Sequence, residues 1–192
     1  MKIQTILVGG ALALLASAAG AQVYAGVGGG VTHFEQDCSG TETCETTSMG
    51  GKFYGGFALN PNVAIELGYL DFGKVKSSGW VNVYGTPVLL HVDLQATAVT
   101  AALALRGPVA RDLSVVGRLG MAQVKMTGKV YTSAFSAPDE NQTTTKPYVG
   151  VGLEYSFSQK LKGVLSADFT QGEIVDESGS LRMVGVGLQY AF

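Results

Sequence analysis

The sequence predicts an all-β protein, an eight-stranded antiparallel up-and-down transmembrane β-barrel. Apolar residues alternate with small or polar ones through most of the chain after residue 22, which is the period-two pattern of β-strands. The chain is also hydrophobic, with positive mean hydropathy and only 15% charged residues. Beyond the first 21 residues no apolar run reaches the roughly 18 residues of a membrane helix. A closed barrel remains, because it pairs every backbone group between strands.

The N-terminal stretch has the features of a signal peptide. Lys2 supplies a positive charge, a short apolar segment follows, and Ala19-x-Ala21 is a small-residue cleavage site. The apolar segment is too short for a transmembrane anchor. We therefore expect residues 1–21 to be removed and residues 22–192 to form one domain, an outer-membrane β-barrel.

Eight segments carry the alternation and are the predicted strands. They are residues 23–34, 51–59, 63–72, 92–105, 113–126, 147–157, 161–170 and 183–192. In the last one, Val184 and Leu188 share an apolar face, whereas Gly185 and Gln189 lie on the other. A soluble β-sandwich would bury one face and wet the other. One apolar face and one Gly-rich, sparsely charged face instead favour lipid outside and a crowded interior.

The predicted connections alternate between long and short. The short ones are Asn60–Asn62, Arg106–Asp112 and Ser158–Lys160, and the others are longer and mostly polar. Outer-membrane barrels have short periplasmic turns and long extracellular loops, so both ends of the mature chain are expected on the periplasmic side.

The second long connection, residues 73–91, is too apolar for a plain hydrated loop. Gly85-Thr86-Pro87 predicts a turn between two β-prone runs. Two interpretations stay open. Either an extended hairpin rises above the membrane and offers Trp80 and Tyr84 to a surface partner, or the segment packs on neighbouring loops or dips into the outer leaflet.

Outward aromatic residues are predicted near both ends of the strands. Those near the short turns are Phe57, Tyr155, Phe157, Tyr190 and Phe192, and those near the opposite end are Tyr69 and Phe72. Aromatic rings favour the lipid–water interface, so these residues predict two interfacial girdles.

Cys38 and Cys44 enclose a small polar loop. Export delivers the chain to an oxidising compartment, so we expect these two residues to form a local disulfide. A metal site would need more ligands, and no His lies beside them.

Other classes of function find little support in the sequence. The net charge of −2 is too weak for a nucleic-acid partner. The Gly-rich run at residues 26–31 lacks a complete G-x-G-x-x-G, so no cofactor is predicted. His91 and Asp93 share a strand face, but no Ser stands at a matching spacing, and His33 is no better placed. We predict no catalytic residue and no metal ligand.

Four stretches resemble the outer membrane protein A-type transmembrane barrel family. KFYGGFALNPNVAIELGYLDFGKV (residues 52–75) is similar to its second hairpin, with Gly-Gly-aromatic, Asn-Pro-Asn and Glu-x-Gly-Tyr elements. GRLGMA (117–122) resembles its fifth strand, GVGLEYSF (150–157) its sixth and GVGLQYAF (185–192) its terminal strand. The resemblance spans essentially the whole mature chain.

The resemblance implies a Gram-negative outer-membrane barrel that is monomeric or nearly so and contacts outer-membrane lipids and lipopolysaccharide. It also implies insertion by the barrel-assembly machinery and periplasmic chaperones, with Tyr190 and Phe192 in the C-terminal assembly signal. Outer membrane protein A carries a peptidoglycan-binding domain after its barrel. This sequence ends at Phe192, so we expect a stand-alone barrel without that cell-wall-binding role.

Family members bury a charged cluster inside the barrel. The matching inward-facing positions here are Glu66, Arg118, Glu154 and Asp168. Two cations of the family pattern are absent, with Ala104 where a Lys is expected and Ser166 where an Arg is expected. Arg118 would then be the central cation among three carboxylates. We expect one carboxylate either to be protonated or to be paired by Lys52 or Lys162 from the barrel ends.

The cluster fits either a structural network or a gate in a narrow pore. An eight-stranded barrel has an interior just wide enough for side chains to fill, which favours the network. We therefore expect a non-enzymatic outer-membrane protein with a structural and surface role, namely membrane integrity, loop display and adhesion to a host or surface ligand. A narrow pore for ions or small solutes is the alternative, and a lipid A-modifying enzyme is a more distant one.

Overall fold

The computed structural model describes residues 22–35, 42–83, 86–132, 140–174 and 177–192. The strands within these ranges are β1 (Gln22–Phe34), β2 (Thr43–Cys44), β3 (Thr47–Asn60), β4 (Val63–Val83), β5 (Thr86–Ala110), β6 (Leu113–Tyr131), β7 (Glu140–Ser156), β8 (Leu161–Ile174) and β9 (Glu177–Ala191). No helix within these ranges is long and apolar enough to cross a membrane.

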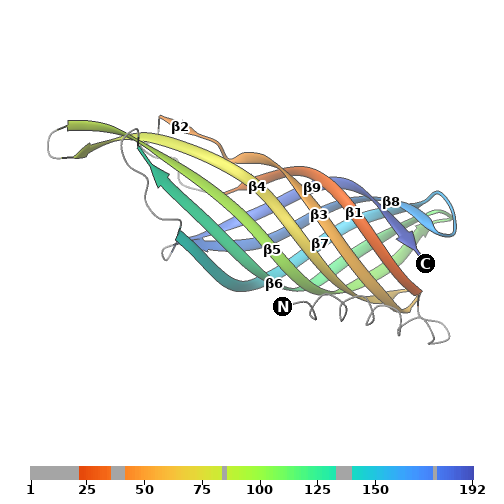
Figure 1. Cartoon of the computed structure of the whole chain (residues 1–192). Coiled ribbons are helices and arrows are strands. Elements are labelled where there is room, and N and C mark those ends of the chain that lie inside the picture. Colours follow the sequence, from red (N-terminus) through yellow and green to blue (C-terminus); the bar gives the residue numbers. More distant parts are fainter. Residues whose placement is uncertain (1–21, 36–41, 84–85, 133–139, 175–176) are drawn as a thin grey trace, which may run out of the picture.

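Eight of these strands close into a ring (Figure 1). Each pairs antiparallel with the next, in the order β1, β3, β4, β5, β6, β7, β8 and β9, and β9 pairs back onto β1 from Ala191 to Leu181. The short strand β2 lies outside the ring and pairs with Ser77 and Ser78 of β4. The predicted eight-stranded antiparallel barrel is confirmed.

Tight turns join the strands at one end of the barrel, which we call the short-turn end. In the turn after β3, the Asn60 side-chain oxygen accepts hydrogen bonds from the backbone N–H groups of Asn62 and Val63, each 2.9 Å long. The turn predicted over Arg106–Asp112 is shorter than expected, because β5 continues to Ala110 and only residues 111–112 turn.

At the opposite end, which we call the hairpin end, strands continue through segments predicted as loops. β4 and β5 stay paired as far as Val83 and Thr86, so the second long connection is a strand hairpin. The predicted turn at Gly85-Thr86-Pro87 is wrong in part, because Thr86 and Pro87 belong to β5, while residues 84–85 lie outside the described residues. Polar side chains indicate that a segment is exposed to water, but the backbone of such a segment can still pair as a strand.

Pairing is least complete between β7 and β8. Their ladder ends at Val149 and Phe169, whereas β7 continues to Glu140 against β6 and β8 continues to Ile174 against β9. Pro147 lies just past the break and has no N–H to donate.

A bulge in β4 changes which side chains face outward. The ladder to β5 shifts between Asp71 and Lys74, and Gly73 adopts a φ of 77° in the left-handed region that favours glycine. The Asp71 carboxylate accepts a 2.9 Å hydrogen bond from the Gly73 N–H. Past the bulge Val75 is buried, while Lys74 and Lys76 are exposed.

The outer face of the ring is apolar, as predicted. Val27, Leu67 and Leu119 are 48%, 63% and 58% exposed, as expected of side chains that face lipid. The prediction was wrong for Phe72, which is fully buried. Strict alternation from Ala64 puts Phe72 on the inner face, so Tyr69 faces outward at this end without it.

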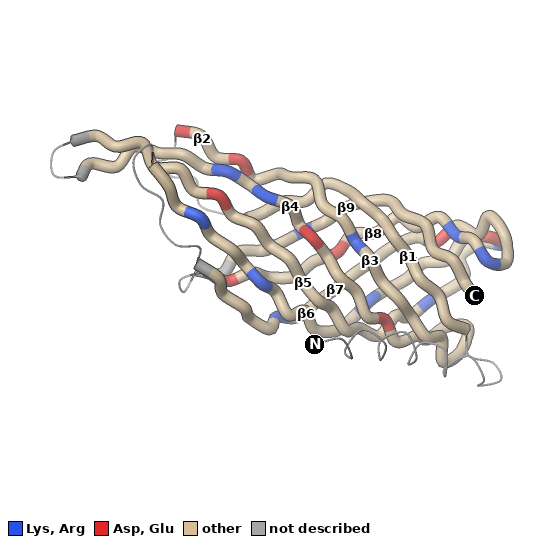
Figure 2. Tube along the Cα trace, viewed as in Figure 1, with Lys and Arg blue, Asp and Glu red and all other residues tan. Residues whose placement is uncertain are grey.

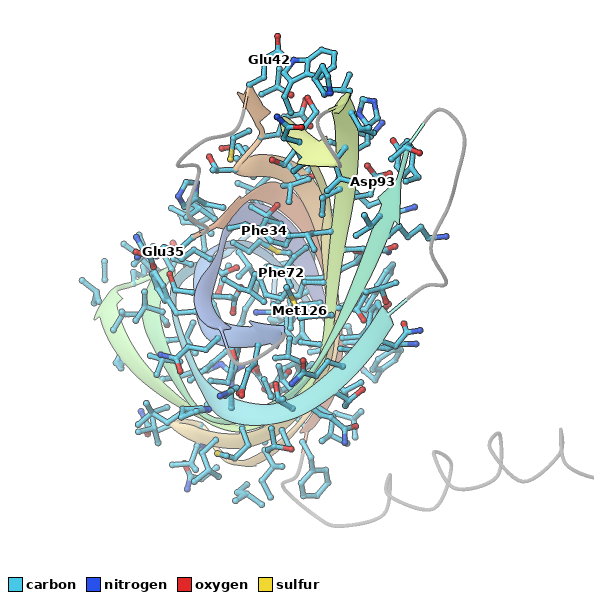
Figure 3. All side chains as sticks on the ribbon, turned by 90° about the vertical axis from the view of Figure 1, so that its left-hand side faces the viewer. Phe34, Glu35, Glu42, Phe72, Asp93 and Met126 are labelled. Carbon is cyan, nitrogen blue, oxygen red and sulfur yellow. The ribbon has the colours of Figure 1, made fainter. Side chains whose placement is uncertain are left out.

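Apolar side chains fill the interior at the hairpin end. Phe34, Leu70, Phe72, Met126 and Leu181 belong to one buried cluster. Viewed along the barrel, the labelled Phe34, Phe72 and Met126 lie in the middle of the ring (Figure 3). A smaller cluster around Tyr24 and Tyr54 lies toward the short-turn end.

Candidate functional site

The interior of the barrel holds a set of charged side chains, which we call the interior ion-pair network. Its members are Lys52 (β3), Glu66 (β4), Arg106 (β5), Arg118 (β6), Glu154 (β7), Lys162 (β8) and Asp168 (β8). Period-two alternation points each of them inward, because each belongs to the small or polar face of its strand.

Glu66 is shared between two guanidinium groups. The Nε of Arg118 lies 2.5 Å from one of its oxygens, and a terminal nitrogen of Arg106 lies 2.8 Å from the other. The Tyr24 hydroxyl donates a 2.6 Å hydrogen bond to the oxygen that Arg106 contacts. Both charges of this carboxylate–guanidinium contact are buried, so removing one partner would leave the other unpaired in a low-dielectric interior.

Glu154 is also shared between two cations. Its oxygens accept hydrogen bonds of 3.0 and 3.2 Å from Nε of Arg106, and Nζ of Lys162 lies 3.0 Å away. Arg106 thus bridges Glu66 and Glu154, joining β4, β5 and β7. Lys162 reaches in from the short-turn end, and its side chain is 27% exposed.

Asp168 depends on a single cation among the described residues. Nζ of Lys52 lies 2.6 Å from its Oδ1, and the Tyr148 hydroxyl donates a 2.5 Å hydrogen bond to the same oxygen. Oγ of Ser166 donates to Oδ2 at 3.1 Å. The Asp168 side chain is fully buried.

Aromatic rings lie beside three of the cations. The Arg106 guanidinium carbon lies 4.7 Å from the Tyr24 ring centre, and the Arg118 carbon and Lys52 Nζ lie 5.4 and 5.3 Å from the Tyr54 ring centre. Rings at these distances attract cations through their faces.

The structure changes the picture of this cluster in two ways. Among the described carboxylates Arg118 pairs only with Glu66, so it is not the central cation among three carboxylates. Arg106, Lys52 and Lys162 supply further positive charge. Sequence reasoning missed Arg106 by assigning it to a turn. Arg106 follows the buried Ala102 and Ala104 at intervals of two residues along β5, and this spacing indicates that its side chain faces inward.

Small residues stand at the two positions where family cations are absent: Ala104 is buried and Ser166 is half-buried. Ala104 stands directly opposite Arg118 across β5 and β6, and Ser166 bonds to Asp168. A cavity of about 10 Å³ beside Lys52, Tyr54 and Ser166 is near the minimum that holds one water molecule. This cavity therefore has room for no more than about one water molecule.

Other predicted residues lie outside this network. The ring of His91 stacks on Tyr131 with centroids 5.2 Å apart, and the Tyr131 hydroxyl donates a 3.4 Å hydrogen bond to Asp93. Trp80 is 57% exposed on β4. Tyr84 and Cys38 lie outside the described residues, so the Cys38–Cys44 disulfide and the contact role of Tyr84 stay predictions. The signal peptide over residues 1–21 also lies outside them.

The C-terminal strand ends at the short-turn end. The Phe192 N–H donates a 3.0 Å hydrogen bond to the Val23 carbonyl, and the rings of Tyr190 and Phe192 meet edge-to-face with centroids 5.3 Å apart. Phe192 is 69% exposed. Its role as an assembly signal stays a prediction. Among the described residues, no three His, Cys, Asp or Glu side chains gather as a metal site would require.

A closed ring with an apolar outer face, short turns at one end and a filled, charged interior defines an eight-stranded outer-membrane β-barrel. The chain belongs to the family of the OmpA-like transmembrane domain, whose family model matches residues 18–191. Its location is the outer membrane.

The curated relatives are named outer membrane protein A. The one from Serratia marcescens is 25% identical over 174 residues, which is 87% of this chain and 42% of the relative. The one from Klebsiella aerogenes is 26% identical over 152 residues, 76% of this chain and 39% of the relative. The chain thus spans about two fifths of the length of these relatives.

Solved structures share the fold. Neisserial surface protein A covers 90% of this chain and 99% of its own, with a TM-score of 0.64 and 9% identity. The attachment invasion locus protein Ail of Yersinia pestis covers 89% and 99%, with a TM-score of 0.55 and 16% identity. The N-terminal barrel of Pseudomonas aeruginosa OprF covers 88% and 97%, with a TM-score of 0.53 and 17% identity.

Proposed function

We propose that this protein is a non-enzymatic structural barrel that supports outer-membrane integrity and displays its hairpin end at the cell surface. The observation that carries the proposal is the filled interior. The interior ion-pair network links β3 to β8 across the barrel axis, and an apolar cluster closes the hairpin end above it. Such an interior supports a rigid anchor more readily than a conduit.

The hairpin supports the display part of the proposal. β4 and β5 remain paired from Gly79 and Leu90 outward, past the last pairs with β2 and β6, so this part projects as a two-stranded ribbon (Figure 1). Trp80 is exposed on it, and an exposed Trp is a common anchor in binding interfaces. We also propose that this ribbon mediates adhesion.

The pore alternative is tested by recording from the full chain in planar lipid bilayers. We expect no conductance steps from the wild type. A variant with Glu66→Ala and Arg106→Ala, which removes the bridge between β4, β5 and β7, serves as an opened control. Steps from the wild type as large as those from the opened control would refute the structural proposal.

The display part is tested in a deletion strain. Wild type and a variant in which residues 79–90 are replaced by a two-residue turn should both restore resistance to detergent and bile salts. Only the wild type should restore surface attachment. If the shortened variant attaches as well as the wild type, the hairpin does not mediate contact. If neither restores resistance, the protein does not support membrane integrity.

A further inference from the structure

Four lysines lie on the outer face of the barrel near the hairpin end, and we call them the lysine patch. They are Lys74 and Lys76 on β4 and Lys125 and Lys129 on β6, all with exposed side chains. β5 runs between the two strands and pairs with both. Figure 2 shows basic segments on β4 to β6 toward the hairpin, with acidic segments among them.

Two different features turn these lysines outward. On β4 the bulge at Gly73 shifts the alternation, so Val75 is buried and the lysines on either side of it face out. On β6 ordinary alternation suffices, because Val124 and Met126 are buried on either side of Lys125. The lysine patch is thus a consequence of backbone register.

The register also places hydrogen-bond donors between the lysines. Lys74 stands opposite Gln95, which stands opposite Thr127, and Lys125 stands opposite Thr97. Directly opposite residues have Cβ atoms about 5 Å apart. Lys74 and Lys125 therefore flank an amide and two hydroxyls, which suit the oxygens of a phosphate, and the Asp71 carboxylate stands opposite Thr97 in the same row.

Lys74, Lys76 and Lys125 form no ion pair with any described residue. Asp93 stands between Lys76 and Lys129, and the Asp71 carboxylate accepts a hydrogen bond from the Gly73 N–H. The Glu45 backbone N–H bonds to the Lys76 carbonyl, which adds one more carboxylate at the edge of the patch.

The other side of the barrel mouth differs. There Arg182 lies 3.3 Å from Glu35, and Lys146 forms an ion pair with Glu173. The labelled Glu35 and Asp93 lie on opposite sides of the ring (Figure 3). Among the described residues at this end, the lysines without an ion pair, Lys74, Lys76 and Lys125, therefore lie on β4 and β6.

The lysine patch lies directly beyond the lipid-facing surface on the same strands. Tyr69, Val99 and Met121 are 44%, 54% and 49% exposed on β4, β5 and β6. A molecule that contacts both regions needs an apolar tail and an anionic head. Long hairpins face the cell exterior in such barrels, so that molecule belongs to the outer leaflet.

We propose that the lysine patch binds the phosphate groups of an anionic outer-leaflet lipid, with Lys74 and Lys125 at the phosphate oxygens and the acyl chains on the apolar surface below. This inference rests on the outer-membrane location and goes beyond the structural role proposed above. A lipid held on β4 to β6 would also brace the base of the hairpin.

The test uses the full chain in phosphatidylcholine nanodiscs and diphosphoryl lipid A as the probe. Each basic residue near an anionic surface contributes about 1 kcal/mol, which is about fivefold in affinity. The double variant Lys74→Gln/Lys125→Gln should therefore bind about 25-fold more weakly than the wild type. The matched control Arg111→Gln/Lys160→Gln removes the same charge at the short-turn end and should bind like the wild type. Lys74→Arg/Lys125→Arg should retain binding.

Three results would overturn the proposal. They are unchanged affinity in the double glutamine variant, equal binding of dephosphorylated lipid A, and displacement of lipid A by inorganic phosphate alone. The third would mean that the patch takes a free anion. The substituted side chains are all exposed, so we expect each variant to fold. Heat-modifiable gel mobility checks that each variant is folded. Bilayer conductance is a separate measurement, so failure of one proposal does not decide the other.

Discussion

Replacing Lys52 with Met should destabilise the barrel more than any other single cation removal in the interior ion-pair network. Asp168 is fully buried and has no second cation among the described residues. Removing one partner of a buried ion pair costs about 3–5 kcal/mol, because the remaining charge is left without compensation. Tyr148 and Ser166 would still donate hydrogen bonds to Asp168, which places the expected cost near 3 kcal/mol.

Replacing Arg106 with Met should cost less stability than replacing Lys52 with Met, although Arg106 has more partners. It forms more hydrogen bonds than Lys52 does, with Glu66, Glu154 and Tyr24. If Arg106 is replaced by Met, however, Glu66 keeps Arg118 at 2.5 Å and Glu154 keeps Lys162 at 3.0 Å. We therefore expect Arg106→Met to cost about 1–2 kcal/mol, less than Lys52→Met.

The assay is urea unfolding of the full chain in lipid vesicles, followed by circular dichroism and by gel mobility. A double variant, Lys52→Met/Asp168→Asn, is the control, because removing both charges of a buried pair is often nearly neutral. It should recover most of the stability that Lys52→Met loses. A larger loss in Arg106→Met, or no recovery in the double variant, would refute the account of how the charges are shared.

Three further predictions concern the barrel wall and its rim. Gly120→Ala should cost about 1–3 kcal/mol, because a Cβ there would lie 2.0 Å from the Ala101 carbonyl oxygen, whereas Gly117→Ala meets nothing within 4 Å and should be tolerated in the same unfolding assay. The pKa of Glu35 is held below 4.5, mainly by a hydrogen bond from Ser180. The stability that the ionised Glu35 carboxylate contributes should therefore be present above pH 4.5 and be lost as the pH falls through that lowered pKa. An NMR titration midpoint at or above 4.5 would contradict this. Amides of residues 170–174 that face β7 should exchange hydrogen faster than amides of β5 that face β6, because the β7–β8 ladder ends at Phe169; equal protection would show that the break closes in the membrane.

Strand faces could be predicted from the sequence almost completely, because alternation is a local property. Once Glu66 and Arg118 were placed in alternating segments, their inward direction followed from the residues beside them. The errors arose where the local pattern was overridden or misjudged. The sequence predicts Phe72 on the outer face and Arg106 in a turn, whereas Phe72 is buried and β5 continues past Arg106.

Partner choice inside the barrel could not be predicted in the same way. Lys52 and Asp168 are 116 residues apart and meet only because the ring closes with a particular stagger between strands. The bulge at Gly73, which turns Lys74 and Lys76 outward, is likewise set by the ladder that β4 makes with β5. Register is a property of two strands at once, and one strand's pattern does not contain it.

The sequence by itself determined the class of protein, the strand faces and the family resemblance, because period-two hydrophobicity, tight-turn residues and ordered motifs are all read within single segments. Only the tertiary structure decided which cation meets which carboxylate, how far the hairpin ribbon extends, and where outward lysines gather. Those features depend on ring closure, shear and a bulge, which bring residues from distant strands to the same height on the barrel.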